Sequence, residues 1–163
     1  MDTFNEQKKV GDQYKLHFFD FFAKFFCILS EKVITRFGEQ GKETIIEAIK
    51  KYGERRGKDI AKIVKSLGKE LTLKNYYVYN TFDTRQTAKY KLNIVEGNIE
   101  AIIRDCVFCN GCKDWDMLEY GKIYCDYIDE AVLKGYNPDL NIEVPTTLTK
   151  GDKRCIQRYI VKK

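Results

Sequence analysis

The sequence predicts an α+β protein, with N-terminal helices packed on an antiparallel sheet of about four strands built from two hairpins separated by a helix. Apolar residues recur at helical spacing through residues 16–67, whereas apolar and polar residues alternate at 88–94 and 140–144. A length of 163 residues suits a single domain. Within it we expect a helical half over residues 1–68 and a sheet half with a cysteine-rich site over 85–163.

The composition excludes several classes of protein. Charged residues make up 33% of the chain and the net charge is +5, but acidic and basic residues are interspersed without a Lys/Arg block, so no specific nucleic-acid partner is expected. No apolar run reaches the roughly 20 residues that span a bilayer, and residues 1–9 lack a signal-peptide core. We therefore expect a cytoplasmic protein without membrane association, whose cysteines are thiols or metal ligands rather than disulfides.

The first predicted helix, residues 14–37, carries more aromatic surface than one helix face can hold. The surplus must contact a second helix, a second subunit or an apolar ligand, and all three remain open. We expect a homodimer formed through this helix. The phenylalanines concerned are Phe18, Phe19, Phe21, Phe22, Phe25 and Phe26.

A second amphipathic helix follows a break at residues 37–41. Gly53 and Gly57 lie four residues apart on it and leave a groove that another backbone or a ligand can approach closely. Arg55 and Arg56 flank this groove. Two interpretations remain: tight helix packing beside solvated arginines, or an anion-binding role for one arginine.

The sheet half follows a connection without clean periodicity over residues 69–84, in which we expect a short helical turn. Two predicted hairpins then flank a helix that Gly135 is placed to end. In order, the segments are a strand from Ala88, a tight turn at 96–98, a partner strand at 99–103, the helix over 118–135, a strand at 140–144, a turn at 150–152 and a final strand at 155–161.

Cys106, Cys109 and Cys112 form a Cys-x-x-Cys-x-x-Cys pattern that we expect on a turn, with Cys125 or Cys155 as a fourth ligand. Thiolates converging in this way suit zinc, at a metal–sulfur distance of about 2.3 Å. An iron–sulfur cluster is the alternative, although the Cys-Pro that ends the ferredoxin pattern is absent. Metal-free thiols and redox or disulfide chemistry also remain open. The predicted metal ligands are Cys106, Cys109, Cys112 and Cys155.

Cys125 and Asp129 lie four residues apart, so both side chains can face the same place on one helix. As a catalytic pair, Cys125 is the nucleophile and Asp129 orients water or relays a proton, provided that a cation or metal offsets their mutual repulsion. Simple burial on an apolar helix face is the alternative for Cys125. His17 is the sole histidine and is expected in the core or at the surface.

Several motifs carry a family resemblance. In the C-terminal part they are Cys106, residues 119–125 (EYGKIYC), Asp129, residues 135–138 (GYNP) and residues 147–155 (TLTKGDKRC), and residues 37–41 (FGEQG) and 52–57 (YGERRG) add to them. Together they resemble the L-2-amino-thiazoline-4-carboxylic acid hydrolase family over most of residues 35–160. The chain departs from the family pattern at Val107, where the family has proline, at Asn110, where it has an acidic residue, and at Gln157, where it tends to have phenylalanine.

The resemblance implies hydrolytic opening of a cyclic isothiourea to an N-carbamoyl cysteine, and kinship with the vinyl reductase or hydrocarbon-binding domains, which are small α+β ligand binders. Two functions therefore stay open. One is a hydrolase of a small thiazoline-like substrate, with Cys125 and Asp129 as catalytic residues and Arg55, Arg56 and Asn137 as substrate-binding residues. The other is a cytosolic module that senses a small molecule or a metal without catalysis.

Overall fold

A computed structural model describes residues 16–82 and 86–161 of the chain and confirms the predicted α+β architecture. The elements are α2 (Phe18–Ser66), α3 (Leu73–Val78), β1 (Ala88–Val95), β2 (Asn98–Cys106), α4 (Val107–Asp114), α5 (Leu118–Tyr136), β3 (Leu140–Thr146), the short 3-10 helix η2 (Leu148–Lys150) and β4 (Cys155–Val161). The expected polar lead-in over residues 1–13 lies outside the described residues.

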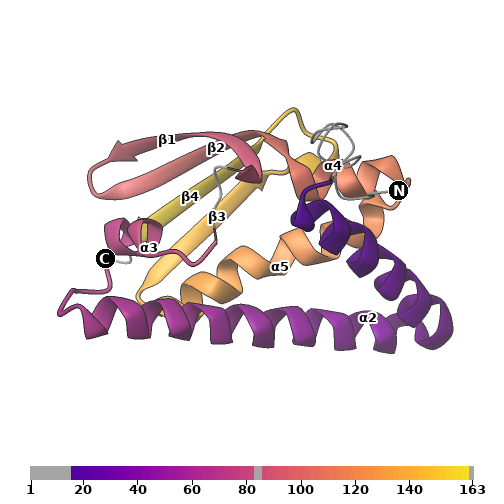
Figure 1. Cartoon of the computed structure of the whole chain (residues 1–163), viewed down its shortest axis with the longest axis horizontal. Helices are drawn as coiled ribbons and strands as arrows, with labels where there is room; N and C mark the ends of the chain where they lie inside the picture. Colours follow the sequence, from indigo (N-terminus) through magenta and orange to yellow (C-terminus); the bar gives the residue numbers. More distant parts are fainter. Residues whose placement is uncertain (1–15, 83–85, 162–163) are drawn as a thin grey trace, which may run out of the picture.

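Both predicted hairpins form, and they join into one antiparallel sheet of order β1-β2-β4-β3. The tight turn between β1 and β2 places Glu96 and Gly97 in left-handed conformations, at φ 51° and 80°, as two-residue hairpin turns require. The central pair β2–β4 sets Ile103 opposite Cys155, which brings the end of one strand beside the start of the other. The helix α5, between the hairpins in sequence, crosses one face of the sheet (Figure 1).

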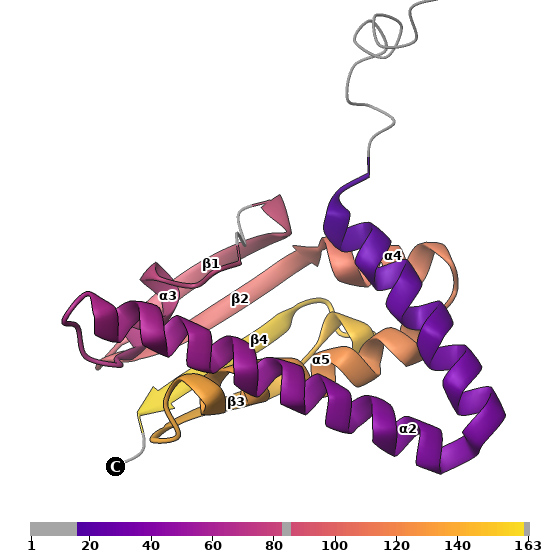
Figure 2. The same ribbon diagram turned by 60° about the horizontal axis from the view of Figure 1, so that its bottom comes forward.

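The two N-terminal helices that the sequence predicts are two arms of one kinked helix, α2. The predicted break coincides with the kink at Gly38, whose φ of 62° and ψ of −141° suit glycine. Helical structure resumes at once, so the break is an elbow rather than a loop (Figure 2). His17 caps the helix, because its Nδ1 accepts a 3.0 Å hydrogen bond from the Phe19 N–H.

Glycines allow the second arm of α2 to pack directly against the backbone of α5. A Cβ atom on Gly57 would lie 2.1 Å from the Val132 carbonyl oxygen, and one on Gly53 would lie 2.6 Å from the Ala131 Cβ. Of the two interpretations of this glycine pair, the structure therefore shows close approach of another backbone. As a result α5 lies between the sheet and α2 (Figure 1).

Gly135 does not end α5, contrary to the sequence-based expectation. It lies inside the helix, where a Cβ would come within 2.2 Å of the Glu54 carbonyl oxygen on α2. The helix continues to Tyr136 and is capped by Asn137. The glycine is needed for helix packing, and the helix ends one residue later than predicted.

The main core lies where α2, α3 and α5 meet the inner face of the sheet. It combines residues from both halves of the sequence, so the helical and sheet halves share one apolar interior. Its buried members are Ile49, Ile60, Ala61, Val64, Leu73, Tyr76, Ile99, Ala101, Ile128, Val132, Leu133, Tyr136, Leu140 and Tyr159.

The surplus of phenylalanine on the first arm of α2 is divided between two faces. Phe19, Phe22 and Phe26 turn inward and pack on Phe108 of α4 and Tyr124 of α5. The other three face outward, with exposed fractions of 79% for Phe18, 56% for Phe21 and 68% for Phe25. One face thus closes a second core cluster, and the other presents an apolar stripe to the surroundings.

Candidate functional site

Three cysteines that are distant in sequence converge where the end of β2, the start of β4 and the helix α5 meet. Cys106 ends β2, Cys155 begins β4, and Cys125 lies on α5, and each thiol interacts electrostatically with the other two. Asp129, one turn after Cys125 on α5, interacts with all three. We call these four residues the cysteine–aspartate cluster. All four residues are half-buried.

Burial raises the pKa of each thiol in the cluster. The effect is largest for Cys125, whose pKa lies well above its usual value. For Cys106 burial also raises the pKa, although the N–H groups of Cys109 and Phe108 at the start of α4 act in the opposite direction. The Cys155 pKa is raised by burial as well, although its Sγ accepts a hydrogen bond from the Leu148 N–H at 3.1 Å. At neutral pH all three are therefore thiols rather than thiolates.

Asp129 is the group in the cluster that titrates close to neutral pH. Burial raises its pKa to about 6, while the positive charge of Arg56 and the amide of Gln157 act to lower it. Gln157 Nε2 donates a 2.6 Å hydrogen bond to Asp129 Oδ2. The group is thus mainly a carboxylate at pH 7, yet basic enough to accept a proton.

The structure separates the two candidate arginines. Arg55 is exposed, whereas Arg56 is half-buried and its charge acts on Asp129. Arg56 Nη2 donates to Asn80 Oδ1 at 2.7 Å, and its guanidinium lies over the Phe82 ring at 5.3 Å from the centroid. These contacts hold one cation beside the cluster.

Gln157 and Tyr159 are site residues that sequence reasoning missed. They follow Cys155 at alternate positions of β4 and so share its face of the sheet. The Tyr159 hydroxyl donates to Gln157 Oε1 at 3.1 Å, which fixes the amide with its nitrogen toward Asp129. The alternation in the final strand was the available signal, but the partner of Gln157 depends on how α5 lies across the sheet.

The segment with Cys109 and Cys112 is a helix, α4, rather than the turn that we expected. Both cysteines are buried, and the Cys112 sulfur lies 3.3 Å from the sulfur of Cys27 on α2. Across residues 16–82 and 86–161, no three His, Cys, Asp or Glu side chains are placed to hold one metal ion. The structure thus does not assemble the predicted set of metal ligands, Cys106, Cys109, Cys112 and Cys155. Zinc binding stays a prediction, and metal analysis of the purified protein tests it.

Asn137 lies roughly two helical turns beyond Asp129, at the far end of α5. Its side-chain amide donates to the Leu71 carbonyl at 2.9 Å, and its Oδ1 accepts from the Asp139 N–H at 2.9 Å. The structure therefore places this predicted substrate-binding residue in a turn that ties α5 to the segment before α3, away from the cluster.

A family comparison supports the resemblance seen in the sequence. The sequence model of the L-2-amino-thiazoline-4-carboxylic acid hydrolases matches residues 19–159, which include the whole cysteine–aspartate cluster. The chain belongs to this family. Its family name makes a hydrolase-like function the coarse assignment. No curated protein matches the chain significantly.

Among solved structures, a trafficking protein particle complex subunit 3 from Naegleria fowleri, covalently bound to palmitic acid, is similar at a TM-score of 0.49 and 12% identity. The match covers 86% of this chain and 95% of that one. Within the part of the chain that the structure describes, no helix is both long and apolar enough to span a bilayer.

Proposed function

We propose that the protein hydrolyses a small cyclic amidine or thiazoline that carries a carboxylate, as 2-aminothiazoline-4-carboxylate does. The observation that carries the proposal is the half-buried carboxylate of Asp129, whose pKa is raised to about 6, beside the charge of Arg56. A base that titrates near neutral pH and a cation that binds carboxylates are the two groups that such a reaction needs.

Asp129 acts as the general base in this proposal. It takes a proton from water as the water oxygen adds to the ring carbon between nitrogen and sulfur. The tetrahedral adduct then collapses with cleavage of the carbon–sulfur bond, and the second proton of the water moves from the adduct oxygen to the former ring nitrogen as the carbonyl forms. The protonated Asp129 returns its proton to the departing thiolate, so that water is consumed and an N-carbamoyl cysteine with a free thiol is released.

Arg56 is the residue that we propose to bind the substrate carboxylate. Its guanidinium is partly accessible and positioned by Asn80 and Phe82. Arg55 is exposed, which leaves it outside this role. A bidentate pair between a guanidinium and a carboxylate fixes the orientation of a small substrate, and lysine would not reproduce it.

Cys125 contributes as part of the wall rather than as the nucleophile in this proposal. Burial raises its pKa, and the neighbouring Cys106 and Asp129 raise it further, so a thiolate is disfavoured. A direct attack by water needs no such thiolate. Replacing Cys125 by serine is therefore expected to leave most of the turnover, whereas replacing Asp129 by asparagine is not.

The test is an assay of 2-aminothiazoline-4-carboxylate hydrolysis that follows the carbamoyl cysteine product by mass spectrometry. Asp129→Asn is expected to lower kcat by on the order of 100-fold or more, as the loss of a general base does. The matched control is Asp126→Asn, because Asp126 lies on the same helix but pairs with Lys122 and Lys150. Unchanged turnover in a folded Asp129→Asn protein would refute the assignment of the base.

A binding module without catalysis is the second candidate. It is favoured by the aromatic group packed next to the thiols, which consists of Phe22, Phe26 and Tyr124. Aromatic side chains beside protonated thiols suit an apolar ligand. Native mass spectrometry of freshly purified protein distinguishes the two: a module of this kind carries a ligand through purification and shows no turnover of the thiazoline.

A further inference from the structure

Cys27 and Cys112 form a pair of thiols outside the cysteine–aspartate cluster. Their sulfur atoms lie 3.3 Å apart and share a hydrogen bond, although the residues are separated by 85 positions in sequence. Both side chains are fully buried. Cys27 belongs to the first arm of α2 and Cys112 to α4, so a bond between them would join two separate elements.

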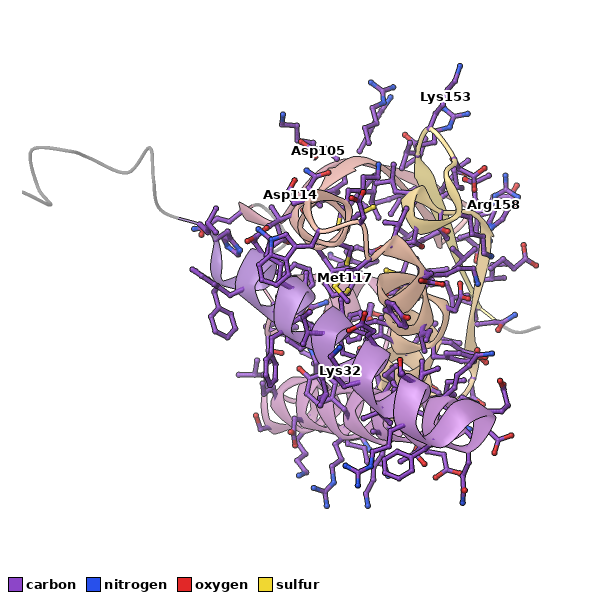
Figure 3. All side chains as sticks on the ribbon, turned by 90° about the vertical axis from the view of Figure 1, so that its right-hand side faces the viewer. Lys32, Asp105, Asp114, Met117, Lys153 and Arg158 are labelled. Carbon is purple, nitrogen blue, oxygen red and sulfur yellow. The ribbon has the colours of Figure 1, made fainter. Side chains whose placement is uncertain are left out.

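The surroundings of the pair fit it closely. A Cβ at Gly121 of α5 would lie 2.4 Å from the Cys112 sulfur, so a glycine is required there to admit the thiol. Sulfur atoms in this region lie around the labelled Met117, among the ribbons of α2, α4 and α5 (Figure 3). Only a small movement of two side chains separates sulfurs at this spacing from the roughly 2.05 Å of a disulfide.

The chemistry of the pair follows from this geometry. Once either thiol has lost its proton, its sulfur can attack an oxidant, and the other sulfur lies close enough to act as the resolving thiol.

The first arm of α2 is held to α4 by polar contacts at its surface as well as by aromatic packing. Lys24 bridges Asp20 of the same arm at 2.9 Å and Asp114 of α4 at 3.4 Å. Asp114 is labelled at the end of α4 in Figure 3. Because the arm joins the rest of α2 through the elbow at Gly38, opening of the arm there is the route by which we expect a small oxidant to reach the buried pair.

We propose that Cys27 and Cys112 are a redox-sensitive pair that hydrogen peroxide converts to a disulfide, locking the first arm of α2 onto α4. The thiolate of one cysteine attacks a peroxide oxygen, which gives a sulfenic acid and, after proton uptake, water. The thiol of the other cysteine then attacks this sulfur, forms the sulfur–sulfur bond and expels a second water. Two thiols are oxidised and one peroxide is reduced to two waters.

The disulfide would fix the first arm of α2, and this arm packs next to the cysteine–aspartate cluster. Phe22 and Phe26 of this arm pack against Tyr124, which directly precedes Cys125 on α5. A disulfide removes the opening of the arm from the native ensemble, so it closes this approach to the cluster. The inference does not depend on the proposed hydrolase function, since it concerns thiols outside the cluster.

The test starts from reduced protein treated with a stoichiometric amount of hydrogen peroxide and mapped without reduction. Trypsin places Cys27 in the fragment 25–32 and Cys112 in the fragment 105–113, which also holds Cys106 and Cys109. Hydroxylamine cleavage between Asn110 and Gly111 then separates Cys112 from the other two. We expect a linked pair of Cys27 and Cys112 fragments that has lost two hydrogens.

Variants and hydrogen exchange complete the test. Cys27→Ser and Cys112→Ser each abolish the linked fragment, whereas the control Cys109→Ser, on the same helix, retains it. In the wild-type protein, oxidation slows amide exchange over residues 18–37 by on the order of 10-fold or more. The peptide map of the oxidised wild-type protein depends on no variant, so it tests the proposal even where a variant misfolds. A different cysteine pairing, or a folded protein in which both thiols stay reduced, would overturn the proposal.

Discussion

The amide of Gln157 donates a hydrogen bond to the carboxylate of Asp129 across 2.6 Å and thereby ties β4 to α5 at the cysteine–aspartate cluster. The hydroxyl of Tyr159 holds the other end of the same amide. The bond stabilises the charged form of Asp129 and so works against burial, which raises its pKa. A glutamine at this position departs from the phenylalanine that the family resemblance leads one to expect.

Replacing Gln157 by leucine is expected to raise the pKa of Asp129 further above 6, because the charged form loses a donor. A hydrogen bond to a charged group contributes about 1.5–3 kcal/mol, so the shift is on the order of one unit. Titration of the Asp129 carboxyl carbon by NMR measures it without reference to activity. Arg158→Leu serves as the control, since Arg158 pairs with Glu100 on the sheet. An unmoved titration would show that the hydrogen bond is not formed in solution.

Asp129→Asn is expected to stabilise the protein at neutral pH. The folded-state pKa of about 6 lies above the usual 3.8, so the native state binds a proton more tightly than the unfolded state between these pH values. Wild-type stability therefore falls as pH rises through this window, and asparagine avoids the loss. The gain at pH 8 is between about 1 and 3 kcal/mol, because one pKa unit corresponds to about 1.4 kcal/mol.

Urea unfolding of wild-type and Asp129→Asn protein at pH 4, 6 and 8 measures this gain. The difference in the free energy of unfolding is expected to grow with pH and to level off above pH 7. Asp126→Asn again provides the control, because that carboxylate pairs with Lys122 and its loss brings no gain. A difference that is the same at all three pH values would contradict the assigned pKa.

Gly57→Ala is expected to destabilise the fold by about 2 kcal/mol or more, because the added methyl group would lie 2.1 Å from the Val132 carbonyl oxygen. Neither helix backbone can yield without separating α2 from α5. The measurement is the urea midpoint, with Lys58→Ala, at the exposed neighbouring position, as the control. A midpoint within a few tenths of a molar of wild type would mean that the two helices are less closely packed.

The outward stripe of Phe18, Phe21 and Phe25 leads us to expect a dimer through the first arm of α2. Phe21→Ser combined with Phe25→Ser is expected to convert it to a monomer, as measured by light scattering on a sizing column. Tyr52→Ser, at an exposed aromatic residue on the second arm, is the control and keeps the dimer. A wild-type protein that is monomeric at all accessible concentrations would refute the prediction.

Local patterns were enough to predict the sheet. The alternation that starts at Ala88 and the turn signal at Gly97 depend only on neighbours in sequence, and both hairpins form where expected. The spacing of Cys106, Cys109 and Cys112 was ambiguous, because a repeat of three residues fits a metal-binding turn and one face of a helix equally well. Asn110-Gly111 favoured the turn, yet Gly111 is needed for close approach to Asp20 within a helix.

Only the part of the candidate site that lies on one helix was predictable from local sequence patterns. Cys125 and Asp129 share a helix face, so their spacing placed them together correctly. The positions of Cys155 and Gln157 relative to them depend on the pairing of β4 with β2 and on the path of α5 across the sheet. Contacts between distant segments of this kind leave no periodic trace in a single sequence.

The packing of α2 against α5 has a consequence for how the chain is made. α2 is translated before α5, and α5 is complete only about 70 residues after α2 ends, which takes several seconds at the usual rate of synthesis. During that interval Ile49, Ile60 and Val64 have no α5 to cover them. We expect the nascent chain to rely on a holdase at this stage, so slow translation of residues 67–136 would lower the yield of native protein even though the finished molecule is unchanged.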